Sequence, residues 1–246
     1  MSTWRVTIEY DGRRFSGWQR QAGARTVQEE VETALARFFG GDRVITHAAG
    51  RTDAGVHALG QVASFRVDVP RDPAKLVLAL NTFLPEDCAV RDARVVEDGF
   101  HARISAKGKL YRYLVWSRPE RSPFWVGRAW YVRRPVDWAK VDAALAMLVG
   151  THEFKGFRAA ACVMKRTVRT ITRVERDEPE PFLHRIEFEG PGFLRYQVRI
   201  MVGTALDVGM GRRTLDDVRA ALETGDRERA GRTAPPDGLY LVEVRY

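Results

Sequence analysis

Alternating hydrophobic and polar positions at the start of the chain predict a strand. Four large side chains fall on one side of an extended chain over residues 3–10: Trp4, Val6, Ile8 and Tyr10. Successive side chains of a strand point to opposite faces, so this segment is expected to have one buried face. Further strands are predicted in the first half of the chain at residues 44–48, 61–67 and 88–96, and the 61–67 strand is expected to be half-buried.

Two helices are predicted between these strands. The first follows a capping box at residues 26–29 and ends at Gly40-Gly41, with an apolar stripe of Val27, Val31, Leu35 and Phe38. The second begins at Asp72-Pro73, ends before Pro85 and is expected to bury Leu76, Val77, Leu80 and Phe83. The order strand, helix, strand, strand, helix, strand is a split βαβ pattern, which forms an antiparallel sheet with helices on one face.

The second half repeats this order loosely, without visible sequence identity to the first. A strand is predicted over residues 110–116, a helix capped by Asp137, strands at 168–177 and 182–189, helices at about 195–208 and after Thr214, and a closing strand at 239–244. The expected fold class is α+β, with a central, mostly antiparallel sheet from two RRM-like or ferredoxin-like halves and flanking helices. The expected division is an N-terminal half at 1–105 and a C-terminal half at 106–246.

The charge of the chain indicates an anionic partner. The net charge is +8, the pI is near 9.8, and 34 of the 40 cationic side chains are arginine. The planar guanidinium fork matches phosphate oxygens well, so nucleic acid is the first candidate. A GC-rich genome or a hot habitat also favours arginine, and the position of the charges is therefore more informative than their sum.

Two segments concentrate these cations. Residues 12–25 carry Arg13, Arg14, Arg20 and Arg25 without an acid, next to Phe15 and Trp18. Such a loop can bind phosphates and stack on bases, although Trp18 could instead cover the edge of the core. The densest run, residues 158–176, holds one acid, Glu175, with Arg158, Lys165, Arg166, Arg169, Arg173 and Arg176. An exposed sheet edge also carries charge, but two basic segments favour an RNA-binding surface.

Several classes of protein are disfavoured by what the sequence lacks. No run of about 18 apolar residues and no signal-peptide core are present, so a soluble protein of the cytoplasm is expected. The two cysteines, Cys88 and Cys162, are far apart and are expected to be reduced core thiols. The scattered histidines give no metal site, and His57 and His101 are expected to form local hydrogen bonds. No nucleotide-binding or hydrolase motif is complete.

One stretch carries the candidate chemistry. Residues 50–62, Gly-Arg-Thr-Asp-Ala-Gly-Val-His-Ala-Leu-Gly-Gln-Val, place Asp53 on a loop between two predicted strands, beside Arg51. Loops held by rigid elements often carry catalytic groups, because the scaffold fixes them while substrate can still reach them. An ordinary turn is the alternative, since an aspartate before Ala-Gly often bonds its own backbone.

The first nine residues of this stretch, Gly-Arg-Thr-Asp-Ala-Gly-Val-His-Ala at 50–58, resemble the signature around the essential aspartate of the tRNA pseudouridine synthase A family. Seven further blocks are similar to family blocks and occur in the same order. They are Tyr-Asp-Gly at 10–12, Phe-Ser-Gly-Trp-Gln-Arg-Gln at 15–21, Phe-His-Ala-Arg at 100–103, Tyr-Arg-Tyr at 111–113, His-Glu-Phe at 152–154 with Phe-Arg at 157–158, Phe-Leu at 193–194 with Val-Arg at 198–199, and Ala-Pro at 234–235 with Gly-Leu-Tyr at 238–240. The resemblance therefore spans nearly the whole chain.

The resemblance implies a fold, an activity and a set of partners. It implies the pseudouridine synthase fold, isomerisation of uridine to pseudouridine at positions 38 to 40 of the tRNA anticodon stem-loop, and a homodimer. The reaction breaks the N1–C1′ bond, turns the uracil and rejoins it through C5, so nothing leaves and no cofactor or metal is expected. A carboxylate can act on such a sugar as a nucleophile or as a base, and the sequence leaves both routes open.

The resemblance also implies roles for individual residues. Asp53 is the catalytic carboxylate, Tyr111 lies against the target base, and Arg199 matches the arginine that faces the aspartate. Arg51 is a candidate for assisting base flipping. Gln197 stands where the family usually has an apolar methionine, so the packing around it is expected to differ.

Two other functions compete with this interpretation. A non-catalytic RNA-binding protein with RRM-like halves fits the charge equally well, but it gives no reason for Gly-Arg-Thr-Asp and no aromatic RNP1-like block is present. A metal-dependent nuclease would need a cluster of carboxylates. The sequence does not identify the tRNA isoacceptors or the geometry of a dimer.

Overall fold

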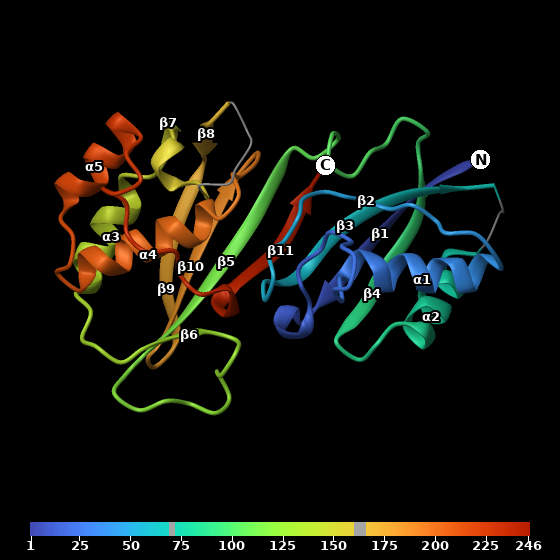
Figure 1. Ribbon diagram of the computed structural model, residues 1–246, viewed down its shortest axis with the longest axis horizontal. Helices are drawn as coiled ribbons and strands as arrows, with labels where there is room; N and C mark the ends of the chain where they lie inside the picture. The colour runs from blue at the N-terminus through green and yellow to red at the C-terminus, as the bar shows by residue number, and fades with distance from the viewer. Residues whose placement is uncertain (69–71, 160–165) are drawn as a thin grey trace. The chain divides into compact units, whose positions relative to one another are not determined.

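The computed structural model describes residues 1–68, 72–159 and 166–246 (Figure 1). The chain forms two compact units, one of Met1–Lys107 with Tyr240–Tyr246 and one of Gly108–Leu239. Residues 240–246, which the sequence division assigned to the second half, thus belong to the first unit. Within the described ranges, no helix has the length and apolar character needed to cross a membrane.

The first unit has the strand order of a split βαβ sheet. β1 pairs antiparallel with β3 and with β4, β2 pairs antiparallel with β3, and β11 pairs parallel with β3. The elements are β1 (Ser2–Tyr10), α1 (Val27–Phe39), β2 (His47–Ala48), β3 (His57–Val67), α2 (Pro73–Phe83), β4 (Cys88–Val96) and β11 (Leu239–Arg245), with a 3-10 turn at Gly12–Arg14. The predicted order of six elements is confirmed, and α1 and α2 lie on one face of the strands (Figure 1).

Of the predictions for the two helices of the first unit, one is confirmed and two need correction. Asp72 caps α2 by accepting a hydrogen bond from the Ala74 N–H, as predicted. The capping box of α1 is wrong: the Thr26 side chain makes no cap bond, and its hydroxyl is buried without a hydrogen-bond partner. In α2 only Leu76 and Leu80 are buried, while Phe83 is exposed.

The 61–67 strand is longer and more deeply buried than predicted. β3 begins at His57, and of its residues 61–67 only Arg66 is exposed. β3 lies between β1 and β11, and both of its faces are covered, so polar side chains such as Gln61 and Ser64 are also buried. This burial holds the residues just before β3 close to the core.

The second unit is built on three long antiparallel strands. β10 lies between β5 and β9, β6 pairs parallel with β5, and β7 and β8 form a separate pair. The elements are β5 (Gly108–Ser117), β6 (Trp130–Val132), α3 (Trp138–Ala146), β7 (Gly150–Glu153), β8 (Val168–Ile171), β9 (Arg173–Glu180), β10 (Leu183–Gly190), α4 (Gln197–Gly209) and α5 (Leu215–Thr224), with 3-10 turns at Lys155–Phe157 and Pro236–Gly238. Together the two units confirm the α+β class with mostly antiparallel strands.

Two predictions for the second unit need correction. The predicted single strand at 168–177 is two strands, β8 and β9, separated at Thr172, whose N–H donates to the Glu189 carbonyl oxygen at 2.8 Å. The break lets β8 pair with β7 while β9 pairs with β10. The helix predicted at about 195–208 begins at Gln197 instead, and every residue of this helix, α4, except Arg199 is buried.

The one cysteine that the structure describes behaves as predicted. The Cys88 thiol is free and buried at the start of β4, and burial raises its pKa to about 12. A thiol with such a pKa stays protonated and unreactive at neutral pH. Cys162 lies outside the described residues.

Candidate active site

Asp53 lies on the predicted loop, between β2 and β3 of the first unit, and is half-buried. The loop turns directly after it: the Val56 N–H donates to the Asp53 carbonyl oxygen at 3.1 Å, and Gly55 has a φ of 79°. A positive φ at this point costs glycine little and other residues more. The turn presents the Asp53 side chain at the edge of the unit rather than in its core.

Thr52 anchors the loop immediately before the aspartate. Its buried hydroxyl and the Tyr10 hydroxyl are 2.8 Å apart, and its carbonyl oxygen accepts from the Trp18 N–H at 3.1 Å. The Gln61 amide donates to the Gly50 carbonyl oxygen at 2.8 Å, two residues upstream of Thr52. These bonds fix the backbone on which Asp53 stands. Neither Tyr10 nor Gln61 was predicted to have a role, although Tyr10 lies in a block that carries the resemblance.

Two glycines allow a second loop to pack directly on this backbone. A Cβ atom on Gly12 would lie 2.1 Å from the Val56 carbonyl oxygen, and one on Gly17 would lie 2.6 Å from the Thr52 carbonyl oxygen. Gly17 also has a φ of 91°. No other amino acid fits either position without moving the Asp53 loop. Residues 12–17 therefore pack against the backbone of the Asp53 loop and limit where it can lie.

His57 joins the two loops through a hydrogen bond to Gly12, which is close in space but 45 residues away in the sequence. The Gly12 N–H donates to His57 Nδ1 at 3.1 Å, and the His57 ring stacks on the Tyr240 ring with centroids 4.6 Å apart. Because Nδ1 accepts this bond, the neutral ring carries its proton on Nε2. The contact of 3.4 Å between Nδ1 and Asp11 is therefore not an ion pair in this state. His101 bonds locally as predicted, with Nδ1 accepting from the Arg103 N–H at 3.1 Å.

The predicted aromatic faces of the 12–25 loop are wrong. Phe15 and Trp18 are 3% and 1% exposed, and their rings pack against the Tyr10 ring at 6.2 and 6.4 Å between centroids. Neither ring can stack on an RNA base without unfolding this corner of the core. The alternative, that Trp18 covers the core edge, is the correct one.

Tyr111 lies on β5 in the second unit and is 9% exposed. Its ring meets the Phe193 ring nearly edge-on, with centroids 5.0 Å apart and an angle of 78°. Tyr113, on the same face of β5, is fully buried, and its hydroxyl donates to the Pro235 carbonyl oxygen at 2.7 Å. Burial raises the pKa of Tyr113 well above its ordinary value, so this hydroxyl remains a donor. Tyr113 is structural, whereas Tyr111 lies near the surface of the unit.

Arg199 is held in place from two sides within the second unit. Its Nε donates to the Ala234 carbonyl oxygen at 2.7 Å, and the Ala234 N–H donates back to the Arg199 carbonyl oxygen at 3.0 Å. The guanidinium also lies over the Tyr196 ring, 4.8 Å from its centroid. These contacts orient the guanidinium, which is half-buried at the start of α4.

Gln197 stands where the resemblance implies an apolar methionine, and only one of its two side-chain polar atoms has a hydrogen-bond partner. Its Oε1 accepts from the Leu194 N–H at 2.7 Å, but its Nε2 is buried without a hydrogen-bond partner. An unpaired buried donor of this kind costs about 1–3 kcal/mol. The hydrogen bonds around Arg199 are intact in spite of this substitution.

The chain is similar in sequence to enzymes that modify RNA. A family model described as tRNA pseudouridine synthase matches residues 6–103 and 144–246. The chain belongs to the tRNA pseudouridine synthase family. It is 46% identical over 246 residues to the tRNA pseudouridine synthase A of Syntrophotalea carbinolica, covering 100% of this chain and 97% of the relative. It is 45% identical over 247 residues to the tRNA pseudouridine synthase A of Streptococcus equi subsp. equi, covering 100% and 99%.

A solved structure of an archaeal box H/ACA sRNP Nop10–Cbf5 complex is also similar. The TM-score is 0.37 and the sequence identity 14%, and the match covers 91% of this chain and 57% of that chain.

The basic loop at 12–25 is a candidate for binding the RNA backbone, but three of its four cations, Arg13, Arg20 and Arg25, already have acidic partners. The Arg13 guanidinium bonds both Asp11 carboxylate oxygens, and Arg20 lies 3.3 Å from Glu29 and 3.7 Å from Glu32. Burial raises the pKa of Asp11, but the hydrogen bonds from Arg13 outweigh it and hold this pKa below its ordinary value. Arg14 and Arg51 are exposed.

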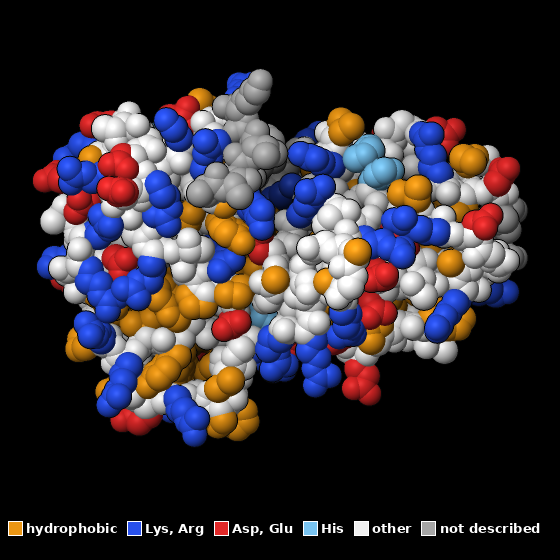
Figure 2. Space-filling view, in the orientation of Figure 1, with side chains coloured by type: hydrophobic (Ala, Val, Ile, Leu, Met, Phe, Trp, Pro, Cys, Tyr) orange, Lys and Arg blue, Asp and Glu red, His pale blue; other side chains and the backbone are white. Residues whose placement is uncertain are grey.

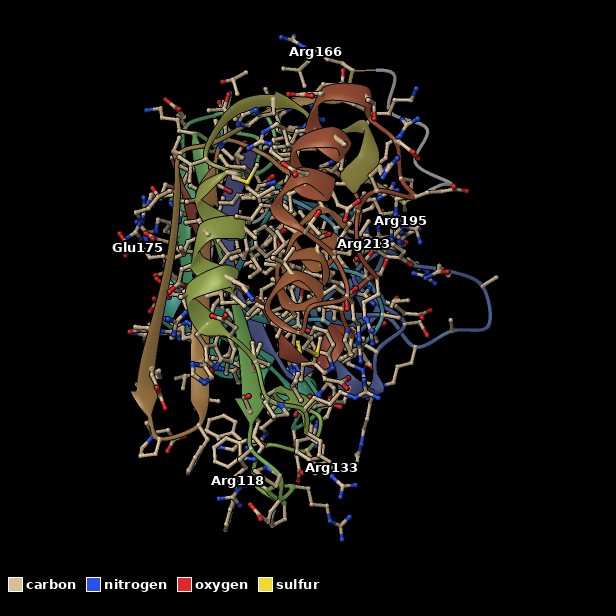
Figure 3. The ribbon with its side chains drawn as sticks, turned by 90° about the vertical axis from the view of Figure 1, so that its left-hand side faces the viewer. Arg118, Arg133, Arg166, Glu175, Arg195 and Arg213 are labelled. Atoms are coloured by element: carbon tan, nitrogen blue, oxygen red, sulfur yellow. The ribbon has the colours of Figure 1, made fainter. Side chains whose placement is uncertain are left out.

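In the second basic segment, residues 158–176, two of the arginines are also paired with acids. Arg173 pairs with Glu175 and Glu189, and Arg176 bonds both carboxylate oxygens of Asp142. Arg166 is exposed and points outward (Figure 3), Arg158 is half-buried, and one Arg169 nitrogen donates to the Arg166 and Val168 carbonyl oxygens at 3.1 and 2.7 Å. Lys165 lies outside the described residues. For a member of this family, Arg166 and Arg169 are the better candidates for phosphate contacts.

Proposed function

We propose that this chain isomerises uridine to pseudouridine in the anticodon stem-loop of tRNA, at positions 38 to 40. The observation that carries the proposal is Asp53, set on a turn whose backbone is bonded through Thr52 and packed against Gly12 and Gly17. A reaction within one nucleotide needs its carboxylate held still relative to the sugar, and positioning of this kind supplies much of the rate.

The chemistry needs one carboxylate and a pocket for a flipped base. The N1–C1′ bond of uridine breaks, the uracil turns, a C5–C1′ bond forms, and the proton lost from C5 is balanced by a proton that N1 gains. Asp53 assists by attacking C1′ as a nucleophile or by removing a sugar proton as a base. Both routes require an ionised Asp53. The resemblance implies that Arg199 faces Asp53, and a guanidinium near a carboxylate favours its charged form.

The resemblance and the charge of the loop suggest two further residues, Tyr111 in the second unit and Arg51 in the first. Tyr111 offers an aromatic ring near the surface of its unit, supported from one side by Phe193. Arg51 is exposed two residues before Asp53 and is proposed to help hold the flipped nucleotide. Flipping costs a few kcal/mol of lost stacking, and contacts of this kind offset it.

The proposal is tested by incubating the protein with unmodified tRNA without added metal and separating the nucleosides of the anticodon stem-loop by chromatography, because pseudouridine and uridine have the same mass. Pseudouridine in place of uridine is expected at positions 38 to 40. Tight tRNA binding without pseudouridine would instead favour the non-catalytic RNA-binding protein.

Replacing Tyr111 with leucine is expected to remove the stacking face and to lower activity. Stacking of a base on an aromatic ring is worth about 1–3 kcal/mol, which corresponds to roughly a tenfold to hundredfold loss of kcat/KM. Tyr111→Phe keeps the ring and is expected to stay within a few fold of the wild type. Activity of the leucine variant equal to that of the wild type would remove Tyr111 from the site.

Replacing Arg166 and Arg169 together with glutamine is expected to weaken tRNA binding and to reduce its dependence on salt. The slope of log affinity against log salt should fall by up to roughly 0.7 to 0.9 for each phosphate that the variant no longer binds. Arg94→Gln with Arg219→Gln, two exposed arginines elsewhere, changes the net charge equally and serves as the control. An equal change of slope in both double variants would place the RNA contacts elsewhere. The proposed RNA surface also includes Arg13, Arg14, Arg20, Arg158 and Lys165.

Two further parts of the proposal come from the sequence: the location from its composition and the oligomeric state from the resemblance. The enzyme is proposed to act in the cytoplasm and as a homodimer.

A further inference from the structure

Tyr196 holds a backbone conformation that its side chain does not favour. Its φ is 65° and its ψ is 1°, which is the left-handed region. Within the described ranges, Phe182 is the only other residue besides glycine with a positive φ. Phe182 lies in the two-residue turn between β9 and β10, and turns of this length commonly require a positive φ. Tyr196 lies directly before α4 instead, where no hairpin turn accounts for its conformation.

The position also departs from the usual start of a helix. The residue before a helix normally has an extended backbone and caps the helix with a short polar side chain. Before the other α-helices of the described ranges, the backbone is extended at Thr26, Asp72, Asp137 and Thr214. The Tyr196 side chain makes no cap bond, and a left-handed backbone is unfavourable for a bulky residue. Local structure therefore gives tyrosine no advantage at this position.

Hydrogen bonds on both sides impose this conformation. The Ala159 N–H donates to the Arg195 carbonyl oxygen at 3.1 Å, and the Gln197 N–H donates to the Leu194 carbonyl oxygen at 3.1 Å. Gln197 Oε1 accepts from the Leu194 N–H at 2.7 Å, so residues 194–197 form a closed turn. An unfavourable conformation persists only where the surrounding structure determines it, and such residues cluster at functional sites. The question is therefore what the tyrosine side chain contributes here.

The Tyr196 ring contacts two guanidinium groups. The Arg199 Cζ lies 4.8 Å from the ring centroid, and the Arg195 Cζ lies 5.0 Å from it. A guanidinium within about 6 Å of an aromatic centroid is attracted by the negative face of the ring. Figure 2 shows cationic side chains spread over the visible face of the second unit, so positive charge alone does not distinguish these two arginines. Their contact with one ring does.

Arg199 is thereby restricted at one edge and on one face. Its Nε donates to the Ala234 carbonyl oxygen at 2.7 Å, which holds one edge of the planar guanidinium. A hydrogen bond at a single edge still lets the plane tilt. The Tyr196 ring lies over the group and limits this tilt, because guanidinium groups stack on aromatic faces. The two contacts together define the direction in which the half-buried guanidinium faces.

We propose that Tyr196 is a positioning residue, whose ring sets the orientation of the Arg199 guanidinium for the reaction. The inference rests on the proposed function, in which Arg199 faces Asp53. Tyr196 acts through Arg199 and not by contact with the nucleotide. A small residue would suit the left-handed backbone better, but it would leave the face of the guanidinium uncovered.

Tyr196→Asn tests the proposal by separating stability from activity. Asparagine tolerates a left-handed backbone and is a good helix cap, so the midpoint of thermal unfolding is not expected to fall. The single-turnover rate of pseudouridine formation should fall roughly threefold to thirtyfold, the range that loss of a cation–π contact gives, with tRNA affinity unchanged. Tyr196→Phe keeps the ring and should keep the rate. An asparagine variant as fast as the wild type, or a phenylalanine variant as slow as the asparagine variant, would overturn the proposal.

Phe182→Gly is the matched control. It also removes an aromatic ring at a positive φ, 70°, in the same unit. The Phe182 ring lies near Trp116 and Arg118, so this variant should retain the wild-type rate. An equal loss of rate in Phe182→Gly and Tyr196→Asn would show a general effect of removing an aromatic residue and would refute the positioning role.

The NMR signal of the Arg199 Nε–H reports the orientation without catalysis. It is assigned by its absence from Arg199→Lys. In the wild type and in Tyr196→Phe, the nearby ring should displace the proton shift, and the bond to Ala234 should slow exchange with water. Tyr196→Asn should lose the displacement. An inactive wild type with these spectra refutes the proposed function and leaves the orienting contact intact, whereas an active wild type whose Arg199 signal is the same in Tyr196→Asn refutes only the inference.

Discussion

Replacing Asp53 with asparagine is expected to leave no detectable pseudouridine while tRNA affinity stays within a few fold of the wild type. The amide has the shape of the carboxylate but neither its charge nor its basicity, so it can serve neither as nucleophile nor as base at the sugar. Affinity for tRNA comes mainly from contacts to phosphates, which this substitution does not touch. The measurement is single-turnover formation of pseudouridine together with filter binding of tRNA.

A matched substitution separates chemistry from a general effect of charge. Asp42→Asn removes one exposed carboxylate from the same unit and should retain full activity. Equal circular dichroism of the two variants shows that the fold is kept. Turnover by Asp53→Asn at even a tenth of the wild-type rate would contradict the catalytic role of Asp53 and, with it, the proposed function.

Sequence patterns predicted those elements whose signals are local. The strand at residues 3–10, the Asp72-Pro73 start of α2 and the helix after Thr214 all occur, because their periodicity or side-chain bonds lie within a few residues. The position of Asp53 on a loop between two strands follows from the same local reasoning.

Errors arose where distant segments determine the structure. Phe15 and Trp18 look like exposed stacking residues in sequence, but they are buried against Tyr10. The cations at 158–176 look unpaired, yet Asp142 and Glu189 neutralise two of them from other elements. Thr26 has the right spacing for a capping box, but its hydroxyl is buried without a partner. Neither the packing partner nor the neutralising acid can be read from the segment itself.

The anchoring of the Asp53 loop is the clearest case of such a distant effect. Glycines at 12 and 17 appear in sequence as ordinary loop residues, and only the structure shows that the backbone of residues 52–56 occupies the space beside them. The position of the Asp53 carboxylate therefore depends on residues about forty positions away, and this dependence can be measured.

Gly17→Ala is expected to reduce the rate of pseudouridine formation by about a hundredfold, the loss that a displacement of about 1 Å at a catalytic group can cause. The new Cβ would lie 2.6 Å from the Thr52 carbonyl oxygen and 3.1 Å from the Asp53 carbonyl carbon, so the Asp53 loop must move. Alanine at a φ of 91° adds strain of about 1–3 kcal/mol and lowers the midpoint of thermal unfolding.

Gly23→Ala separates these two effects. Gly23 lies in the same loop with a φ of 70°, but a Cβ on it meets no atom within 4 Å. This variant should therefore lose a little stability and keep its activity. Measured at a temperature where both variants are folded, the single-turnover rate should fall for Gly17→Ala alone, with tRNA affinity unchanged in both. If both variants lose activity equally, backbone strain in the 12–25 loop is responsible, and direct contact with the Asp53 loop does not position the carboxylate.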